Sequence, residues 1–452
     1  MKVINKLTRS DYLSLSSMLF GIFFGAGNLI FPVLLGQQAG SQTLEATLGF
    51  ILSAVGFSLM GLLGLSLTKS NNVLDIASPG GKLFAYFFNI VMLLVIGPAL
   101  ILPRLATTSF ELGISAFIQP KHYFIARLIF SVGFFLIVFL LALKPTKLVD
   151  YIGKYLTPTF LVLLLILIIF ALIKTPVHIG NLPATAAYQH NAFLSGFLEG
   201  YNTVDAGVSI LFGSLAISAL KDLGVAKPKQ IAIDTVKAGF FAMALMAALY
   251  GLLTLVGAMS VNYTSRAANG GIILVAVAKH LFGTLGLILL MLIVILACLK
   301  TAIGISSAVA DGFNEMLPKV SYPIFLALAC VISMLLALFG LTKITIITSP
   351  LLMFIYPFAL VIIMLAFLNP LVQHNPLIYK VTLGFTFLPA VACGLRELPA
   401  QMQQIGWIKQ YLNLINHLPL ANVGMAWVIP ALIGFVLSLI ISKIISKLLK
   451  VS

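Results

Sequence analysis

The sequence predicts an all-α protein that crosses a membrane many times, and three observations support this. Of the 452 residues, 61% are hydrophobic and 9% are charged, and the mean hydropathy is +1.12. Soluble domains do not have this composition. The apolar runs reach the roughly 20 residues that a membrane helix needs. They are rich in Leu, Ile, Phe and Met and lack the alternation of a membrane β-barrel. We therefore expect a bundle of transmembrane helices.

Twelve apolar segments follow one another along the chain. An even number places both termini on one side, and the side with more Lys and Arg is cytoplasmic. With cytoplasmic termini, 17 of the 27 Lys and Arg residues are assigned to the inside, 9 to the outside and Lys300 to neither side. Topology therefore accounts for the net charge of +15 without a nucleic-acid partner. The expected spans are residues 11–36, 43–68, 82–112, 122–143, 148–173, 192–219, 230–260, 283–310, 320–340, 344–367, 378–395 and 420–442.

The first span carries a polar interruption at its centre. Residues 23–28 read Phe-Phe-Gly-Ala-Gly-Asn, where an intact membrane helix would carry Leu, Ile or Val. Irregular backbone at this depth is tolerated only where it lines a cavity or lies buried in protein. Freed carbonyl groups can hold an ammonium, and N–H groups that start the next half-helix can hold a carboxylate. The break indicates a site for a zwitterion such as an amino acid; a simple kink or a glycine-lined helix contact is the alternative.

The sixth span repeats this feature. Residues 197–207 read Phe-Leu-Glu-Gly-Tyr-Asn-Thr-Val-Asp-Ala-Gly. Interruptions five spans apart are typical of transporters built from inverted repeats, because an odd number of spans per repeat inverts the second copy. We expect residues 1–175 and 190–368 to form two five-helix repeats, with two further helices in residues 378–452. The site should lie where spans one and six meet. Residues 269–282 further predict a short external helix between spans seven and eight, which could act as a lid. A plain surface loop is the alternative.

Four motifs resemble the signatures of the bacterial branched-chain amino acid carrier family. They are Gly-Ile-Phe-Phe-Gly-Ala-Gly-Asn-Leu-Ile-Phe-Pro at 21–32, Ile-Gly-Pro at 96–98 with Leu-Pro-Arg at 102–104, Gly-Tyr-Asn-Thr-Val-Asp at 200–205, and Leu-Ala-Cys-Leu-Lys-Thr-Ala-Ile-Gly at 296–304. The resemblance covers nearly the whole chain. It implies a leucine-transporter-like fold, in the amino acid, polyamine and organocation superfamily. It also implies cation-coupled import of leucine, isoleucine and valine through the plasma membrane of a bacterium.

The resemblance assigns the substrate's carboxylate and amine to the backbone of the two breaks. Asn28 could offer its side-chain carbonyl to a cation, or it could hold the break open by bonding freed backbone groups. The Tyr201 ring could cover an apolar substrate side chain or simply pack. The resemblance implies an apolar pocket between spans one, three, six and eight. Candidate wall residues are Phe23, Phe24, Val204 and Ile303, although core packing is the more common role of such side chains. The expected substrate-binding residues are Phe23, Phe24, Gly25, Ala26, Gly27, Asn28, Gly200, Tyr201, Asn202, Thr203 and Val204.

The prediction of the coupling ion rests on the residue at position 300, which is a lysine. In the wider fold a sodium site uses carbonyls of the first span, here Gly21 and Phe24, with a carbonyl at Ala297 and hydroxyls at positions 300 and 301. Thr301 fits this pattern and Lys300 does not. A charge at the centre of a membrane helix needs a cavity or a partner, so we expect the Lys300 ammonium among those carbonyls, with Asp205, Glu199 or the substrate as its partner. The hypothesis is proton coupling without sodium. The alternatives are a Lys300 that snorkels to water, and a sodium site formed by Thr301 with Ser306 or Ser307.

Arg104 and Glu111, near the outer end of span three, could close a gate through an ion pair, or Arg104 could anchor the helix at the headgroups.

A channel is a rival function, but a channel would have a continuous polar lining. An enzyme is a second rival, but the sequence has no convincing catalytic constellation, metal cluster or nucleotide-binding loop. We expect no cofactor beyond a coupling sodium ion or proton. The expected partners are an amino acid and the lipid bilayer, with no obligatory protein partner.

Overall fold

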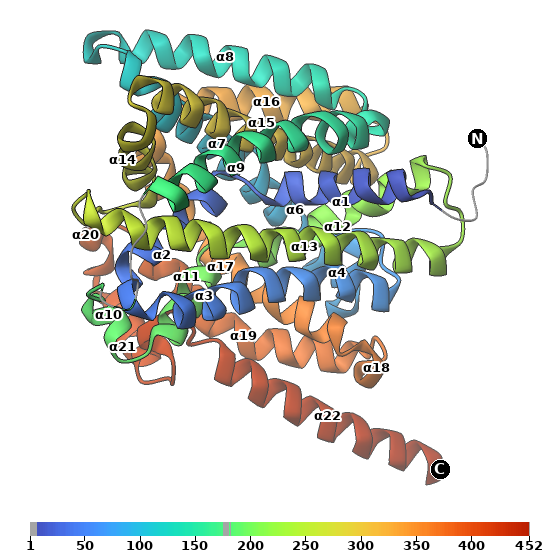
Figure 1. The fold of residues 1–452 in the computed structure, drawn as a ribbon. Coiled ribbons are helices and arrows are strands. Elements are labelled where there is room, and N and C mark those ends of the chain that lie inside the picture. The colour runs from blue at the N-terminus through green and yellow to red at the C-terminus, as the bar shows by residue number, and fades with distance from the viewer. Residues whose placement is uncertain (1–6, 175–179, 181, 452) are drawn as a thin grey trace.

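A computed structural model describes residues 7–174, 180 and 182–451. These residues form a bundle of helices that run side by side, and they contain no β-strand (Figure 1). The helices are α1 (Arg9–Phe23), α2 (Ala26–Ala39), α3 (Thr43–Ile51), α4 (Phe57–Thr68), α5 (Val73–Ala77), α6 (Lys82–Leu94), α7 (Ile101–Ser109), α8 (Tyr123–Ala142), α9 (Thr157–Lys174), α10 (Ala186–Gln189), α11 (Ala192–Tyr201), α12 (Asp205–Asp222), α13 (Pro228–Met259), α14 (Gly270–Phe282), α15 (Thr284–Met316), α16 (Tyr322–Ala337), α17 (Leu341–Phe367), α18 (Asn369–Val372), α19 (Pro376–Arg396), α20 (Ala400–Gln403), α21 (Gly406–Asn416) and α22 (Val428–Val451).

The number of membrane spans differs from a simple count of apolar segments. Within the described part of the chain, nine helical segments are long and apolar enough to cross a membrane, or ten if α11 and α12 form one bent span. Helices α1 and α16 have only 15 and 16 residues. Short turns join α2, α3 and α4 into one segment, Ala26–Thr68. The expected number of twelve spans therefore stays a prediction.

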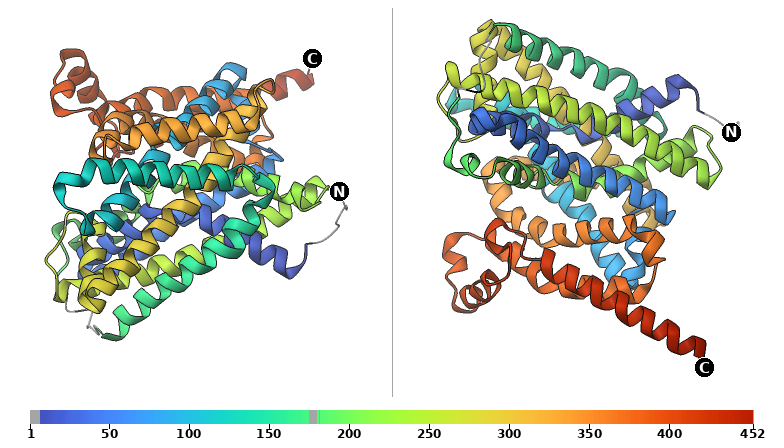
Figure 2. Two further views of the ribbon diagram at one scale, coloured as in Figure 1. Left: turned by 90° about the horizontal axis from the view of Figure 1, so that it is seen from above. Right: turned by 60° about the horizontal axis from the view of Figure 1, so that its bottom comes forward.

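The two ends of the bundle differ. The start of α1 and the end of α22 lie at the same end, on the right in Figures 1 and 2. Helix α14 lies at the opposite end, where the sequence predicted a short external helix. Asn269 is the N-cap of this helix, and its Oδ1 accepts a hydrogen bond from Ile272 N at 3.1 Å. Among the charges used to predict topology, Lys2 and Lys6 lie outside the described residues, as do the side chains of Lys447 and Lys450.

The first and sixth segments are both interrupted. Helix α1 ends at Phe23, Gly25 is extended at φ −92° and ψ −163°, and α2 begins at Ala26. Helix α11 ends at Tyr201 and α12 begins at Asp205, with a bend of 47° between them. Val204 precedes α12 in the left-handed region, at φ +64°. That conformation is a strained one for a β-branched residue, and strained backbone of this kind clusters at functional sites.

Each broken segment packs on a helix from the other half of the chain. Helices α1 and α2 contact α13, while α11 packs on α3 and α12 packs on α4. The α2–α13 contact is close because it uses glycine on both sides. A Cβ on Gly36 would collide with the carbonyl of Thr254, and one on Gly257 would collide with the carbonyl of Val33. Small residues allow this close approach of two membrane helices. The breaks are therefore fixed by the far half of the chain.

The third segment is also bent. Between α6 and α7, residues Val95–Ala99 form a π turn in which Gly97 leaves the helical region, at φ −87° and ψ −119°. Pro98 follows, and proline removes a backbone donor from the helix. The bend starts a new helix, α7, beside the first break, and α7 carries Arg104.

Candidate functional site

A cavity of about 90 Å³ lies between the two breaks. A single water needs only about 10–15 Å³ on this measure, so the space could hold a small molecule. Its walls come from α1 and α2, α7, α12, α15 and α17, which include the first, third, sixth and eighth spans that the resemblance suggested. The lining includes Phe23, Gly25, Ala26, Gly27, Asn28, Arg104, Thr203, Val204, Asp205, Thr301 and Leu352.

A buried polar network connects the two breaks. Asn28 Oδ1 accepts a hydrogen bond from Gly25 N at 2.9 Å, which closes the first break on itself. Asn28 Nδ2 donates to Asp205 Oδ2 at 2.7 Å and to the Tyr250 hydroxyl at 2.5 Å. Tyr250 in turn donates to Asp205 Oδ2 at 3.1 Å. Asn28 therefore bonds to the backbone of its own break and joins this break to the sixth segment. Its Oδ1, which the sequence offered to a cation, accepts from Gly25 N.

Seven of the expected substrate residues line the cavity, and four do not. Phe24 carries its ring to the other side of the break, where it stacks on Phe20 with centroids 5.0 Å apart. Tyr201 turns toward the C-terminal helices: its ring packs on Tyr356 at 4.8 Å, and its hydroxyl accepts a hydrogen bond from Trp427 Nε1 at 3.2 Å. The structure therefore gives Tyr201 a packing role, in place of a cover for the substrate. Gly200 and Asn202 also lie outside the lining.

Lys300 lies at the centre of α15 with 0% exposure and points to the first break. Its ammonium donates to the carbonyl of Gly21 at 2.8 Å and to the carbonyl of Phe24. The neighbouring Thr301 donates to the same Gly21 carbonyl at 3.3 Å. These are the two carbonyls that the sodium site of the wider fold would use. Ala297 is buried one turn earlier on α15.

Aromatic rings surround the rest of the Lys300 ammonium. Nζ lies 4.4 Å from the centroid of Phe160, 5.5 Å from that of Phe20 and 5.6 Å from that of Phe24. Ring faces attract a cation at such distances. In the described part of the chain, Lys300 forms no ion pair with Asp205 or Glu199. Its ammonium is bound to the carbonyls of Gly21 and Phe24, and Asp205 bonds to Asn28 and Tyr250. The expectation of an acidic partner from span six is corrected in this respect.

The alternative hydroxyls of α15 do not join this arrangement. Ser306 lies beside Cys330, and Ser307 lies beside Tyr322, both on α16. Both serines therefore lie on the side of α15 that packs against α16. The geometry gives no support to a sodium site formed by Thr301 with either serine.

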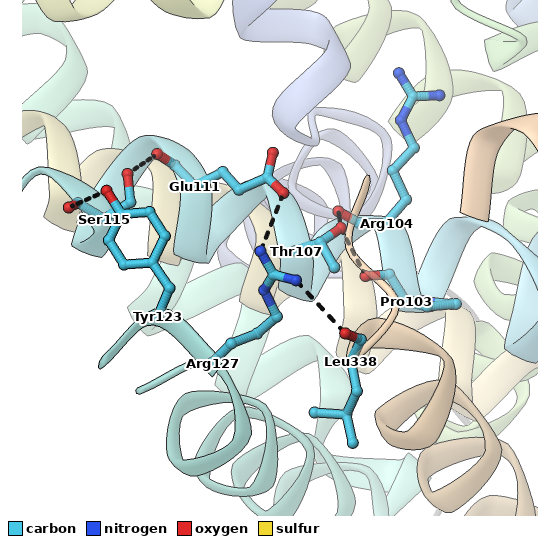
Figure 3. Close-up of polar contacts among 8 residues, drawn as sticks. All are labelled: Pro103, Arg104, Thr107, Glu111, Ser115, Tyr123, Arg127 and Leu338. Carbon is cyan, nitrogen blue, oxygen red and sulfur yellow. Dashed lines mark hydrogen bonds and ion pairs between the residues drawn. The ribbon is translucent and has the colours of Figure 1, made fainter. Parts of the chain in front are cut away.

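The expected gate pair is not formed (Figure 3). Glu111 Oε1 lies 3.9 Å from Arg127 Nη2, and Arg127 also donates to the carbonyl of Leu338 at 3.5 Å. The guanidinium of Arg104 points away from both residues. Arg127 pairs with Glu111 because α8 places it beside the end of the third segment. Arg104 lies in the first turn of α7, next to the cavity.

Sequence reasoning missed Tyr250 and several residues that line the cavity, such as Leu352. Tyr250 lies in the long apolar run of α13, where a tyrosine gives no signal of its own. Leu352 belongs to α17, a fifth wall of the cavity beyond the four expected. Only the three-dimensional arrangement shows that these residues reach the breaks.

Comparison with known proteins gives a family match across the chain. The family described as "Branched-chain amino acid transport protein" matches residues 8–445. The branched-chain amino acid permease BrnQ of Lactobacillus delbrueckii subsp. lactis is 38% identical over 98% of this chain and 99% of its own length. BrnQ of Bacillus subtilis is 35% identical over 97% of this chain and 98% of its own length. The branched-chain amino acid transport system 2 carrier protein of Pseudomonas aeruginosa is 32% identical over 97% of each chain.

Two solved structures share the fold at low sequence identity. Mhp1, a nucleobase-cation-symport-1 family transporter in a closed conformation with bromovinylhydantoin bound, has a TM-score of 0.60 at 12% identity, covering 96% of this chain and 92% of its own. MhsT in complex with L-phenylalanine has a TM-score of 0.53 at 16% identity, covering 96% of this chain and 98% of its own. The fold is therefore that of the leucine-transporter-like secondary transporters, as the sequence predicted.

Proposed function

Because the chain belongs to the branched-chain amino acid transport protein family, we propose that it imports leucine, isoleucine and valine across a bacterial membrane by alternating access. The observation that carries this proposal is the cavity between two broken segments, whose lining is mostly apolar and includes polar residues from both breaks, such as Asn28 and Asp205. Transporters of this architecture bind their substrates at such breaks, near the middle of the bilayer. The proposal involves no chemical reaction.

The substrate would lie against the first break, with its charged end on the backbone of Gly25, Ala26 and Gly27. The first amides of a helix have no intrahelical partner and favour an anion. The side chain would extend along Phe23 and Val204. An apolar pocket discriminates by only about 1–3 kcal/mol per methylene, so the three branched substrates should compete with one another.

The repeat organisation would supply the moving parts. In this proposal residues 1–175 and 190–368 are inverted repeats, residues 378–452 add two helices, and both termini are cytoplasmic. Helices α1 and α2 pack on α13, and α11 and α12 pack on α3 and α4. Each broken segment thus packs against the other half of the chain, which supports two repeats that interlock in this way. The location of α1 and α22 at one end of the bundle supports termini on one side.

Lys300 would couple transport to protons. In its charged form the ammonium attracts the carbonyls of Gly21 and Phe24 and so ties the inner half of the first segment to α15. A neutral amine would lose most of this attraction, and α1 could then move. A lysine is a titratable point charge and can take such a role in a buried site. The ammonium already lies between the two carbonyls that a sodium ion would need, which favours coupling without sodium.

The transport proposal is tested with the purified chain in proteoliposomes. We expect saturable uptake of radiolabelled leucine, and accelerated exchange when unlabelled leucine, isoleucine or valine is loaded inside. A channel would pass leucine without saturable counterflow, which would contradict alternating access. Absence of leucine transport under proton, sodium and voltage gradients would contradict the substrate assignment.

A further inference from the structure

The cavity between the breaks holds two side chains of opposite charge in apolar surroundings. Among the described residues that line it, Arg104 and Asp205 are the only ones with an ionisable side chain. Most of the remaining walls come from side chains such as Ile22, Phe23 and Phe212. Charged groups inside a membrane are costly and normally face a partner or a functional cavity. Their presence together in one small cavity calls for a ligand that carries both charges.

Among the described residues, the guanidinium of Arg104 has no hydrogen-bond or ion-pair partner. Within the described chain its backbone makes hydrogen bonds, to Leu100 and from Thr107, but its side chain makes no hydrogen bond or ion pair. The nearby acid, Glu111, is held by Arg127, and the guanidinium points away from this pair (Figure 3). Arg104 is half-buried. A guanidinium in this position gains from a carboxylate, which it can bind through two parallel hydrogen bonds.

Asp205 is the acidic side chain of the cavity, and it has no cationic partner among the described residues. It is 6% exposed, and its Oδ2 receives both hydrogen bonds described above, from Asn28 and Tyr250. These are neutral donors. The two ion pairs among the described residues, Arg127–Glu111 and Lys154–Asp150, do not include Asp205. A carboxylate has acceptor capacity on both oxygens, so Asp205 can accept from an ammonium while it keeps the bonds that hold the breaks together.

We propose that Arg104 and Asp205 form a zwitterion clamp, in which Arg104 binds the α-carboxylate of the substrate and Asp205 binds its α-ammonium. The proposal deepens the transport function and rests on it. The clamp adds two charged side chains to the backbone groups of the breaks. It selects for α-amino acids through their common head group and leaves the apolar walls to select for the side chain. Arg104 is thus a specificity residue, in place of the gate residue that the sequence suggested.

The clamp is tested by two analogues that each lack one charge of leucine. 3-Methylbutan-1-amine has no carboxylate, and 4-methylpentanoic acid has no amine. A site built for a polar group rejects an analogue that lacks it, because its own group stays unpaired. The full-length chain is purified in detergent, and binding is followed by competition with labelled leucine and by thermal stabilisation with each compound alone. For the wild-type chain we expect both analogues to bind at least about 100-fold more weakly than leucine.

Charge-removing variants should change these preferences selectively. Arg104→Gln should weaken leucine binding by at least about 30-fold, as expected for one partner of a buried charge pair, and should bring leucine and the amine to within about 3-fold of each other. Asp205→Asn should do the same for leucine and the acid. Arg104→Lys keeps the charge without the two-pronged geometry, so it should retain the preference for leucine over the amine with weaker binding. The matched controls, Arg127→Gln and Asp234→Asn, change an arginine and a buried acid that do not line the cavity and should keep both preferences.

The possible results separate the clamp from the transport function. If the wild-type chain binds leucine but Arg104→Gln and Asp205→Asn keep the wild-type ratios between leucine and its analogues, the clamp is wrong and the transport proposal is unaffected. If the wild-type chain does not bind leucine, the proposed function itself fails. A residue that only gates access would change the rate of transport but not the preference between leucine and the amine. Should Arg104→Gln fail to fold, a loss of the preference in Arg104→Lys would overturn the clamp.

Discussion

Asn28 donates a hydrogen bond from Nδ2 to Oδ2 of Asp205 at 2.7 Å, and this contact joins the break in the first segment to the break in the sixth. The two residues are 177 positions apart in the chain. Both are buried, at 5% and 6% exposure. The bond therefore depends on the packing of the two halves, and the position of each break depends on the other.

Asn28→Asp should strongly reduce leucine uptake. The change removes the donor to Asp205 and places a second carboxyl group beside it, and like charges at this distance repel. We expect uptake to fall at least about 10-fold, because a buried acceptor left unsatisfied costs about 1–3 kcal/mol. Initial rates in proteoliposomes measure the effect. Asn89→Asp is the control, since Asn89 is also buried but bonds to Met316 Sδ. Wild-type uptake by Asn28→Asp would show that the bond is not needed.

Tyr250→Phe should lower leucine affinity while it keeps the aromatic packing. The hydroxyl accepts from Asn28 and donates to Asp205, whereas the ring stacks on Phe24 at 5.8 Å. Loss of such a buried hydroxyl should weaken binding by roughly 5- to 10-fold, at about 1 kcal/mol or slightly more. Binding of labelled leucine to the purified protein checks this. The control is Tyr379→Phe, because the Tyr379 hydroxyl is buried and has no hydrogen-bond partner among the described residues. Equal affinities in the two variants would contradict the role of Tyr250.

Val204→Gly should be more stable than Val204→Ala. Val204 has φ +64°, where a Cβ costs about 1–2 kcal/mol and glycine has no such cost. Both variants remove the side chain that lines the cavity, so both should bind leucine more weakly than the wild type. Thermal unfolding without substrate, followed by fluorescence or light scattering, compares them. An alanine variant as stable as the glycine variant would mean that this backbone is not strained.

Gly36→Ala should destabilise the protein far more than Gly251→Ala. A Cβ on Gly36 meets the Thr254 carbonyl of α13, and backbone cannot move aside as a flexible side chain can. No atom lies within 4 Å of a Cβ on Gly251, which is also on α13. In that open position alanine is favoured over glycine by up to about 1 kcal/mol in a helix. We expect a lower unfolding temperature for Gly36→Ala and an equal or higher one for Gly251→Ala. The reverse order would contradict the close α2–α13 contact.

The sequence predicts the breaks well because an intact membrane helix rarely carries a cluster of glycine and polar residues at its centre. This pattern predicts the breaks at residues 23–28 and 200–205. The position of Lys300 was also predictable, since a central charge must face protein and the family pattern named the carbonyls of Gly21 and Phe24.

The remaining features depend on distances that a sequence does not contain. Two arginines, Arg104 and Arg127, lie near Glu111 in the chain, and only the bend at Gly97 and the course of α8 decide which one pairs with it. Tyr201 ends α11 directly before the second break, but its ring packs on Tyr356 and does not line the cavity. Tyr250 gives no signal in an apolar helix. Tertiary packing decides all three.

Substitution of Lys300 should abolish the coupling of leucine transport to protons, whereas loss of another lysine should not. Lys300→Met removes the charge that binds the carbonyls of the first break. The matched control is Lys174→Met, because Lys174 has the same kinds of partner, the carbonyl of Leu281 and the rings of Phe170 and Phe282, at the end of α9. Lys300→Ser would place a hydroxyl next to Thr301 and should gain dependence on sodium.

The most direct measurement is leucine accumulation in sodium-free proteoliposomes under an imposed inward proton gradient. Wild-type protein and Lys174→Met should concentrate leucine when only protons are supplied, and Lys300→Met should not. Wild-type uptake that rises with sodium at constant pH and constant membrane potential would contradict coupling through Lys300.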